Sequence, residues 1–237
     1  MILDKRQQLY HYGFIMGQFK ETESLSNLMR LCGEIRNKEI KPDYNLVEKY
    51  QNTIDLKPSP IDYDECFLSV LKENNIDKIF EECTGNDFCL SNLQVRTAYP
   101  NKDGKEYNYM PWHRDNYIYK EQSEKPVGPM PPGFKLNFYP DLDNKEDEVV
   151  GLIPGSHLQI RFSKEEDYSQ KFSYTPISFK SSKNTYIIFN TSLMHGTLPT
   201  KNKRGNLRIL YNFVQKIHLQ SKEAEEINKK YKDFINE

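Results

Sequence analysis

Two histidines and an aspartate in this sequence have the residue types and spacing of a metal site. His113 and Asp115 stand two residues apart in the stretch 111–115. Alternate side chains of a strand point to the same face, so we expect these two to aim at one point. His195, far downstream, would add a second imidazole. Two imidazoles and a carboxylate on one face of a metal are the usual protein environment of non-haem Fe(II) in oxygenases.

Two apolar runs surround the downstream histidine. The β-branched and aromatic residues 185–190 predict a buried strand that leads toward His195. Residues 206–214 predict another, in which Arg208 lies between apolar neighbours. A buried guanidinium needs an anionic partner. A dicarboxylate cosubstrate would supply one through bidentate pairing.

Several segments occur in a characteristic order over most of the chain. They are 12–15 with 24–28, 83–88, 113–115, 151–157 with its Pro-Gly-Ser-His sequence, 195–197, and Arg208. In their order and spacing, they resemble the phytanoyl-CoA dioxygenase-like family of Fe(II)/2-oxoglutarate-dependent oxygenases.

The resemblance implies roles for individual residues. His113, Asp115 and His195 would ligate Fe(II) and form the catalytic centre. Arg208 would pair with the distal carboxylate of 2-oxoglutarate, helped by the hydroxyl of Thr197. The expected cofactors are therefore Fe(II), 2-oxoglutarate as cosubstrate, and O₂.

Two arginines compete for the cosubstrate. The family's spacing from the last histidine to the arginine falls between those of Arg204 and Arg208 in this chain. We favour Arg208 because it lies within an apolar strand. Arg204 lies in a polar turn, where we expect it to be solvated.

The resemblance also implies a reaction, in which 2-oxoglutarate is converted to succinate and CO₂ while a substrate C–H bond is hydroxylated. Related halogenases replace the ligand carboxylate with a small residue, so Asp115 favours hydroxylation. A non-catalytic cupin-like barrel that binds a metal or ligand, or another 2-oxoglutarate oxygenase subclass, is the alternative. The substrate stays open: an acyl thioester, a small metabolite, a modified amino acid or a peptide side chain.

Composition limits the partners and the compartment. A net charge of −1 over 237 residues gives no general attraction to nucleic acid or anionic membranes. No apolar run is long enough to span a bilayer, and the amino terminus turns charged before any signal-like stretch forms. Cys32, Cys66, Cys83 and Cys89 lack metal-type pairing and are expected to be reduced. We expect a cytoplasmic protein and leave its oligomeric state open.

The predicted fold is mainly β: a double-stranded β-helix (jelly roll, cupin-like) barrel with flanking α-helices at the N-terminus and a C-terminal helix. We expect one domain over 1–237. Residues 1–87 would give mostly helical support, 88–218 the barrel core and 219–237 the final helix.

The pattern of apolar residues predicts the individual elements. Residues 24–36 have helical spacing with a possible cap at Ser24. Residues 41–62 are interpreted as a loop with a short helix, and 64–82 as two short helices broken near 74–75. Residues 221–234 predict an amphipathic helix.

Two long polar loops, 120–132 and 161–172, adjoin the predicted site and are interpreted as lids. Three further polar residues could reach the 1-carboxylate of 2-oxoglutarate, but the strand parity leaves the choice open: Gln94, Arg96 and Asn137.

The remaining histidines have structural interpretations. We expect His157 to hydrogen-bond its own turn, and His11 and His218 to lie at or near the surface.

Overall fold

The computed structural model describes residues 3–50, 53–85, 88–98, 112–115, 133–140, 150–159, 177–178, 184–197, 206–219 and 221–237. The described helices are α1 (Lys5–Tyr12), α2 (Glu23–Arg36), α3 (Cys66–Glu73), α4 (Ile76–Thr84) and α6 (Lys222–Asn236), with 3₁₀ turns at Pro60–Asp62, Ser156–Leu158 and Lys216–His218. The described strands are β1 (Phe14–Gln18), β2 (Asn45–Tyr50), β3 (Thr53–Lys57), β4 (Phe88–Ala98), β5 (Gly133–Phe138), β6 (Val150–Leu152), β7 (Ile177–Ser178), β8 (Thr185–Asn190), β9 (His195–Thr197) and β10 (Asn206–Gln215).

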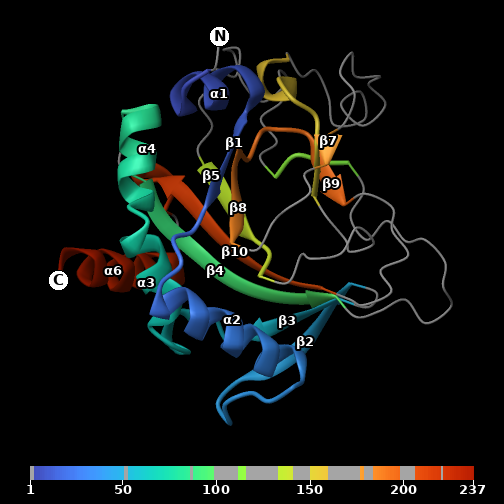
Figure 1. Ribbon diagram of the computed structural model, residues 1–237, viewed down its shortest axis with the longest axis vertical. Coiled ribbons are helices and arrows are strands. Elements are labelled where there is room, and N and C mark those ends of the chain that lie inside the picture. Colours follow the sequence, from blue (N-terminus) through green and yellow to red (C-terminus); the bar gives the residue numbers. More distant parts are fainter. Residues whose placement is uncertain are drawn as a thin grey trace, which may run out of the picture.

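The described strands form two antiparallel sheets. The larger has seven strands in the order β1-β8-β5-β10-β4-β3-β2, and the smaller has three in the order β7-β6-β9. The helices α3, α4 and α6 lie along one side of the long strands β4 and β10, while β7 and β9 lie beyond the other side (Figure 1). The sheet thus separates a helical layer from the layer that holds His195.

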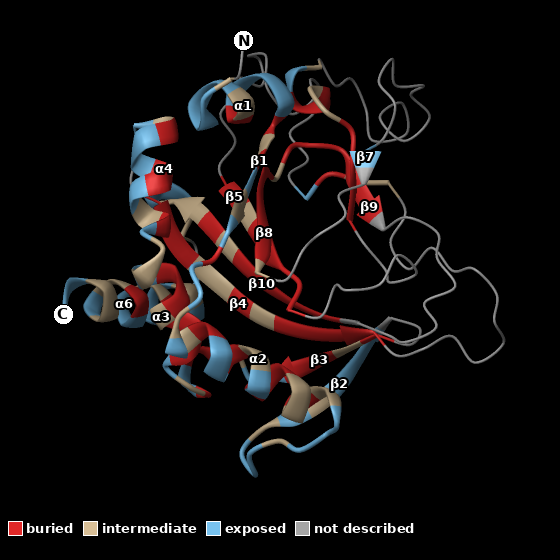
Figure 2. Ribbon diagram, viewed as in Figure 1, coloured by how far each residue is buried: buried red, intermediate tan, exposed pale blue. Residues whose placement is uncertain are grey.

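One face of the large sheet forms the main hydrophobic core. Along β10, the alternate residues Leu207, Ile209, Tyr211 and Phe213 are buried in the same cluster as the apolar faces of α2, α3, α4 and α6. Figure 2 shows buried residues along β4, β5, β8 and β10. The period of two in a strand puts the residues between them on the opposite face.

The helix layer is joined to this face by aromatic contacts and a hydrogen bond. The Phe213 ring lies 4.6 Å from that of Phe80 in α4, measured between centroids. The Tyr211 hydroxyl donates to the Phe67 carbonyl of α3 over 2.9 Å. The burial of Tyr211 raises the pKa of its hydroxyl well above the ordinary value, so that it remains a donor.

The interpretation of 41–62 as a loop with a short helix was wrong for most of the segment, although a 3₁₀ turn is present at Pro60–Asp62. β2 and β3 form an antiparallel hairpin that extends the large sheet at β4, where Asp55 pairs in register with Arg96. The exposed Val47 and the buried Asp55 reverse the usual relation between hydrophobicity and burial. The apolar pattern therefore did not mark either strand.

Helix ends agree in part with the sequence. The cap of α2 lies two residues earlier than expected, at Thr22 rather than Ser24, and the Thr22 side chain accepts a hydrogen bond from the Leu25 amide over 3.2 Å. The expected break before α4 is confirmed at Asn75, which is left-handed, and Gly85 ends α4 in the same conformation. The helix α1 was not anticipated.

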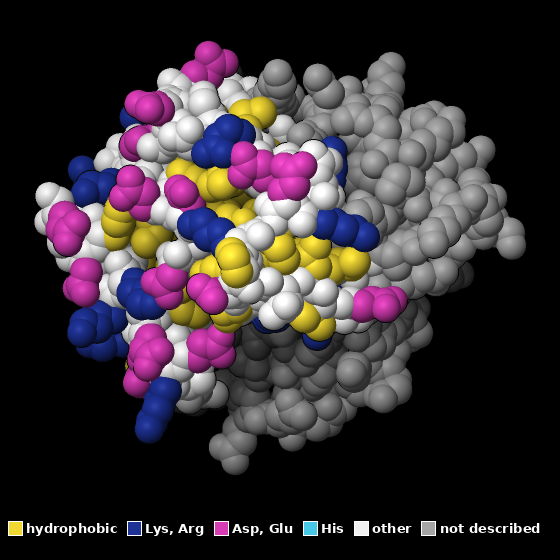
Figure 3. Space-filling model, turned by 90° about the horizontal axis from the view of Figure 1, so that it is seen from below, with side chains coloured by type: hydrophobic (Ala, Val, Ile, Leu, Met, Phe, Trp, Pro, Cys, Tyr) yellow, Lys and Arg dark blue, Asp and Glu magenta, His cyan; other side chains and the backbone are white. Residues whose placement is uncertain are grey.

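The surface carries both signs of charge. On the described part of the face in Figure 3, Lys and Arg side chains alternate with Asp and Glu around hydrophobic side chains. Among the helices that the structure describes, none has the length and apolar character needed to cross a membrane.

Candidate metal centre

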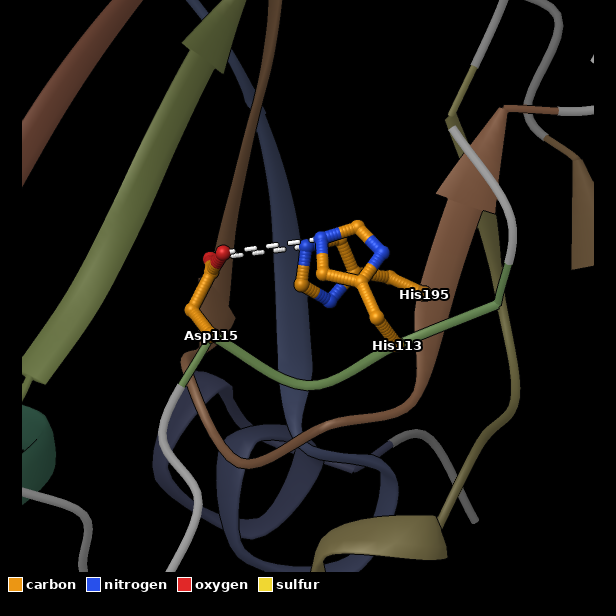
Figure 4. Close-up of side chains that lie close together, drawn as sticks. All are labelled: His113, Asp115 and His195. Carbon is orange, nitrogen blue, oxygen red and sulfur yellow. Dashed lines mark ion pairs between the residues drawn. The ribbon is translucent and has the colours of Figure 1, made fainter. Parts of the chain in front are cut away.

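The structure brings His113, Asp115 and His195 together. One ligand atom of each lies within 4.8 Å of the others. The carboxylate of Asp115 points toward two imidazole rings that lie side by side (Figure 4). His113 Nε2 is 3.6 Å from Asp115 Oδ1, and His195 Nε2 is 3.4 Å from Asp115 Oδ2.

Backbone hydrogen bonds hold these residues in place. His113 and His195 form an isolated antiparallel bridge, with N–O distances of 2.8 and 2.9 Å. The amide of Asp115 donates to the carbonyl of Thr191 over 2.9 Å. Two segments distant in the sequence are therefore tied together at the point where the three side chains meet.

The imidazole of His195 is oriented by a second contact. Its Nδ1 lies 2.9 Å from the Leu193 carbonyl, which can only accept, so Nδ1 carries the proton. The lone pair is then on Nε2, which faces Asp115. Such a contact fixes the tautomer and orientation of metal-ligating histidines. The Phe189 ring packs against the imidazole at 4.7 Å between centroids.

The local electrostatics favour the protonation states that metals need. Burial raises the pKa of Asp115, but the neighbouring ammonium of Lys135 lowers it, and the pKa of Asp115 lies well below its ordinary value. Burial also lowers the pKa of His195, and this effect exceeds the opposing influence of Asp115. At neutral pH the site therefore holds a carboxylate and, at His195, a neutral imidazole.

The residue between the two upstream ligands has a structural role. Arg114 is fully buried, and its guanidinium donates to the carbonyls of Ser156, over 2.9 Å, and Ser192. Ser156 Oγ accepts from the Met194 amide over 2.8 Å. The Pro-Gly-Ser-His segment thus supports both the segment of His113 and the approach to His195.

His157 behaves as a structural histidine. It is 1% exposed, and its Nε2 lies 2.9 Å from the Tyr10 carbonyl of α1. It also packs against Gly13, whose φ of +83° ends α1, so a side chain at Gly13 would meet the imidazole. His11 and His218 are exposed, as expected.

A small cavity of about 30 Å³ opens beside His195. Its walls come from β4, β5, β6, β8, β9 and β10, and its lining residues are Arg96, Lys135, Asn137, Tyr139, Val150, Phe189, His195, Gly196, Arg208 and Leu210. Arg96, Asn137 and Arg208, which the sequence offered as contacts of 2-oxoglutarate, therefore line one cavity.

The two arginines of the cavity lie directly opposite each other on neighbouring strands. Arg208 of β10 is 5% exposed and pairs in register with Arg96 of β4. Arg96 makes a bidentate contact with Asp55, at 2.6 and 2.8 Å. One carboxylate thus adjoins a row of two guanidinium groups. The second arginine candidate, Arg204, lies outside the described residues.

The other predicted features have mixed outcomes. Arg96 and Asn137 are placed on the cavity side of their strands, which resolves the parity left open by the sequence. Thr197 pairs through its backbone with Val150, and its side chain lies outside the description. The segments 120–132 and 161–172, interpreted as lids, also lie outside the described residues.

Sequence reasoning missed Lys135. Its ammonium lies 2.6 Å from Asp115 Oδ2. The signal was available in β5, where Lys135 and Asn137 alternate with three apolar residues and mark a polar face on a buried strand.

Comparison with known proteins gives matches among solved structures. No family model and no curated protein matches the sequence. EvdMO1 is 18% identical with a TM-score of 0.64, over 90% of this chain and 49% of its own, so the chain spans about half the length of EvdMO1. The non-haem α-ketoglutarate-dependent epimerase SnoN is 10% identical with a TM-score of 0.65, over 89% of this chain and 82% of its own. EctD from S. alaskensis, solved with 2-oxoglutarate and 5-hydroxyectoine, is 16% identical with a TM-score of 0.63, over 89% and 74%.

These likenesses concern the fold. They confirm the mainly β prediction, a double-stranded β-helix with flanking helices. At such low identity they leave substrate and reaction to be argued from the site itself. The chain has the fold of non-haem α-ketoglutarate-dependent enzymes such as SnoN.

Proposed function

We propose that the protein is a non-haem Fe(II)- and 2-oxoglutarate-dependent dioxygenase that hydroxylates a C–H bond of a small-molecule or acyl substrate. The observation that carries the proposal is the position of His113, Asp115 and His195 beside a cavity that also contains the buried Arg208. Either feature alone is common in proteins. Their juxtaposition on the fold shared with SnoN and EctD is the specific point.

The three proposed ligands fit a first-row metal ion. Neighbouring ligands at about 2.1 Å from a metal lie roughly 3 Å apart. The distances of 3.6 and 3.4 Å from the carboxylate oxygens of Asp115 to the imidazoles of His113 and His195 need only a small contraction. Two imidazoles and one carboxylate with open positions are typical of non-haem Fe(II). With Fe(II) and 2-oxoglutarate bound there, oxidative decarboxylation to succinate and CO₂ would supply two of the four electrons that reduce O₂, and the hydroxylated C–H bond of the substrate would supply the other two.

The charges of the cavity suit a dicarboxylate. Arg208 is 5% exposed and lies opposite Arg96, which itself makes a bidentate contact with Asp55. A carboxylate in the cavity could accept bidentate hydrogen bonds from the Arg208 guanidinium. We assign Arg208 to the distal carboxylate of 2-oxoglutarate, and we propose that the hydroxyl of Thr197 assists.

Hydroxylation is the reaction that we favour. Asp115 supplies the carboxylate that the halogenases of this type lack, which argues against halide binding. Some structures with this fold perform other reactions, since SnoN is an epimerase and SnoK a carbocyclase. The observation that supports a small-molecule substrate is the presence of 5-hydroxyectoine with 2-oxoglutarate in the structure of EctD.

Succinate formation tests the proposal without a known substrate. Purified protein with Fe(II), 2-oxoglutarate and O₂ should release succinate slowly, and a screen of small metabolites and acyl thioesters should find a compound that accelerates the release. The variant His195→Ala should form no succinate, while His218→Ala, which alters an exposed histidine, should match the wild type. Equal succinate release from wild type and His195→Ala would contradict the proposal. No release from the wild type, with metal binding shown separately, would favour a non-catalytic binding barrel.

A further inference from the structure

Among the residues that the structure describes, Lys135 brings a cationic side chain into direct contact with a proposed metal ligand. Its Nζ is 2.6 Å from Asp115 Oδ2, the oxygen that also lies 3.4 Å from His195 Nε2. The side chain of Lys135 is 16% exposed, and it lines the same cavity as Arg208. The ammonium group of Lys135 thus contacts the carboxylate that would ligate a metal ion.

Lys135 and a divalent cation have competing demands on Asp115. A carboxylate that ligates a metal gives up part of its charge to that metal, so its attraction for a neighbouring ammonium falls. The two positive charges also repel each other across a few ångströms, in surroundings where most neighbours are buried. On these grounds Lys135 should oppose the binding of a metal ion alone.

The cavity could hold a second anion beside Lys135. Asn137 follows on the same face of β5 and is 5% exposed, and its Oδ1 has no hydrogen-bond partner among the described residues. Oxygen and nitrogen of an amide exchange by a flip, so this end can present donors to a carboxylate. The walls of the cavity thus hold Lys135 and Asn137 on β5 and Arg208 on β10. A dicarboxylate there would place one negative group near each strand.

We propose that Lys135 couples the binding of the metal to that of the dicarboxylate. Resting on the proposed function, this inference adds that Lys135 disfavours the metal alone and contacts the carboxylate of the cosubstrate nearest to the metal. Each ligand then strengthens the binding of the other, because coupling free energies between two ligands are reciprocal. The metal is retained mainly when the cosubstrate accompanies it.

Binding measurements on Lys135→Met test the coupling. The substitution keeps the length of the side chain and removes its charge. Anaerobic titrations with Mn(II) alone, and with 2-oxoglutarate at saturating Mn(II), would be followed by the electron paramagnetic resonance of free Mn(II) and by calorimetry. We expect Lys135→Met to bind Mn(II) alone at least about fivefold more tightly, and 2-oxoglutarate at least about fivefold more weakly, than the wild type.

The opposite signs make the result specific. A variant with a damaged fold would bind both ligands more weakly, and Lys230→Met, which removes a surface lysine paired with Asp62, should change neither affinity. Weaker or unchanged Mn(II) binding by Lys135→Met would overturn the inference, since Lys135 would then only orient Asp115. Unchanged 2-oxoglutarate affinity would overturn it as well. Failure of the wild type to bind either ligand would instead contradict the proposed function.

Discussion

Alternate residues of the same strands lie on opposite faces of the large sheet, and the two faces differ in composition. In β10, Leu207, Ile209, Tyr211 and Phe213 join the helix-covered core, whereas Arg208 turns to the cavity. The first face is apolar and closely packed. The second holds buried charges, which cost free energy unless they are paired. The comparison indicates that the helix face stabilises the fold, while the cavity face, under the proposed function, would use some of that stability to bind ligands.

The largest effect on stability should come from the helix face. Phe213→Ala removes a ring that is 1% exposed and contacts Phe80 and Tyr231. We expect the free energy of unfolding to fall by about 3–5 kcal/mol, as for other large-to-small changes in cores. Urea denaturation measures this loss. A loss below about 1 kcal/mol would mean that the helix face does not carry the stability.

On the cavity face, we expect a substitution to change ligand binding and not stability. Arg208→Met should weaken 2-oxoglutarate binding by about 10- to 100-fold, because charge-assisted hydrogen bonds to the carboxylate are lost. The free energy of unfolding should be unchanged or higher, since replacing a buried charge by an apolar side chain is often neutral or stabilising. Calorimetry and urea denaturation give the two values. The comparison fails if stability falls as much as in Phe213→Ala while the affinity is unaffected.

The two faces should also differ in their response to pH. Burial lowers the pKa of His195 in the folded protein, while its pKa in the unfolded chain is about 6.5. Below that pH the unfolded chain takes up a proton first, so His195 lowers stability there by at most about 1.4 kcal/mol per pH unit and has no such effect above it.

Urea denaturation without added metal at about pH 7.5 and 5.5 measures this effect. The wild type should lose more stability between them than His195→Gln. For Asp115, whose folded pKa is depressed, the contribution is lost only below the unfolded value of about 3.9 and does not enter this window. Equal losses in both proteins would contradict the interpretation of His195 as a buried neutral imidazole.

The smallest effect concerns a single hydrogen bond of the helix face. Tyr211→Phe removes the bond from the hydroxyl to Phe67 and should cost about 1 kcal/mol. The loss should be the same at both pH values, because the pKa of Tyr211 is raised far above them. A loss of stability that differs between the two pH values would contradict the expectation that only the cavity face responds to pH in this range.

The sequence predicted the convergence of the candidate metal ligands better than it predicted their surroundings. The two-residue spacing was interpreted as a strand, but His113 forms an isolated bridge with His195, and the amide of Asp115 donates separately to Thr191. The burial of Arg208 followed from its apolar neighbours. These inferences needed only local patterns.

Features that depend on pairing between distant strands were missed. β3 escaped notice because its buried Asp55 is compensated by Arg96, a partner on another strand that no local pattern reveals. The alternation of β5 marks Lys135 as part of a polar face, but it does not reveal the contact with Asp115, which belongs to a separate segment. Buried polar residues look like loop residues until their partners are known.

Binding of Fe(II) and 2-oxoglutarate in one chelate is the central claim, and an anaerobic titration tests it most directly. Fe(II) and then 2-oxoglutarate are added to the purified protein, and the visible metal-to-ligand charge-transfer band is recorded for wild type, His195→Ala and Arg208→Ala. The account predicts a saturable band in the wild type, its loss in His195→Ala, and a higher 2-oxoglutarate requirement in Arg208→Ala. Absence of the band in an iron-loaded wild type, or an undiminished band in His195→Ala, would contradict it.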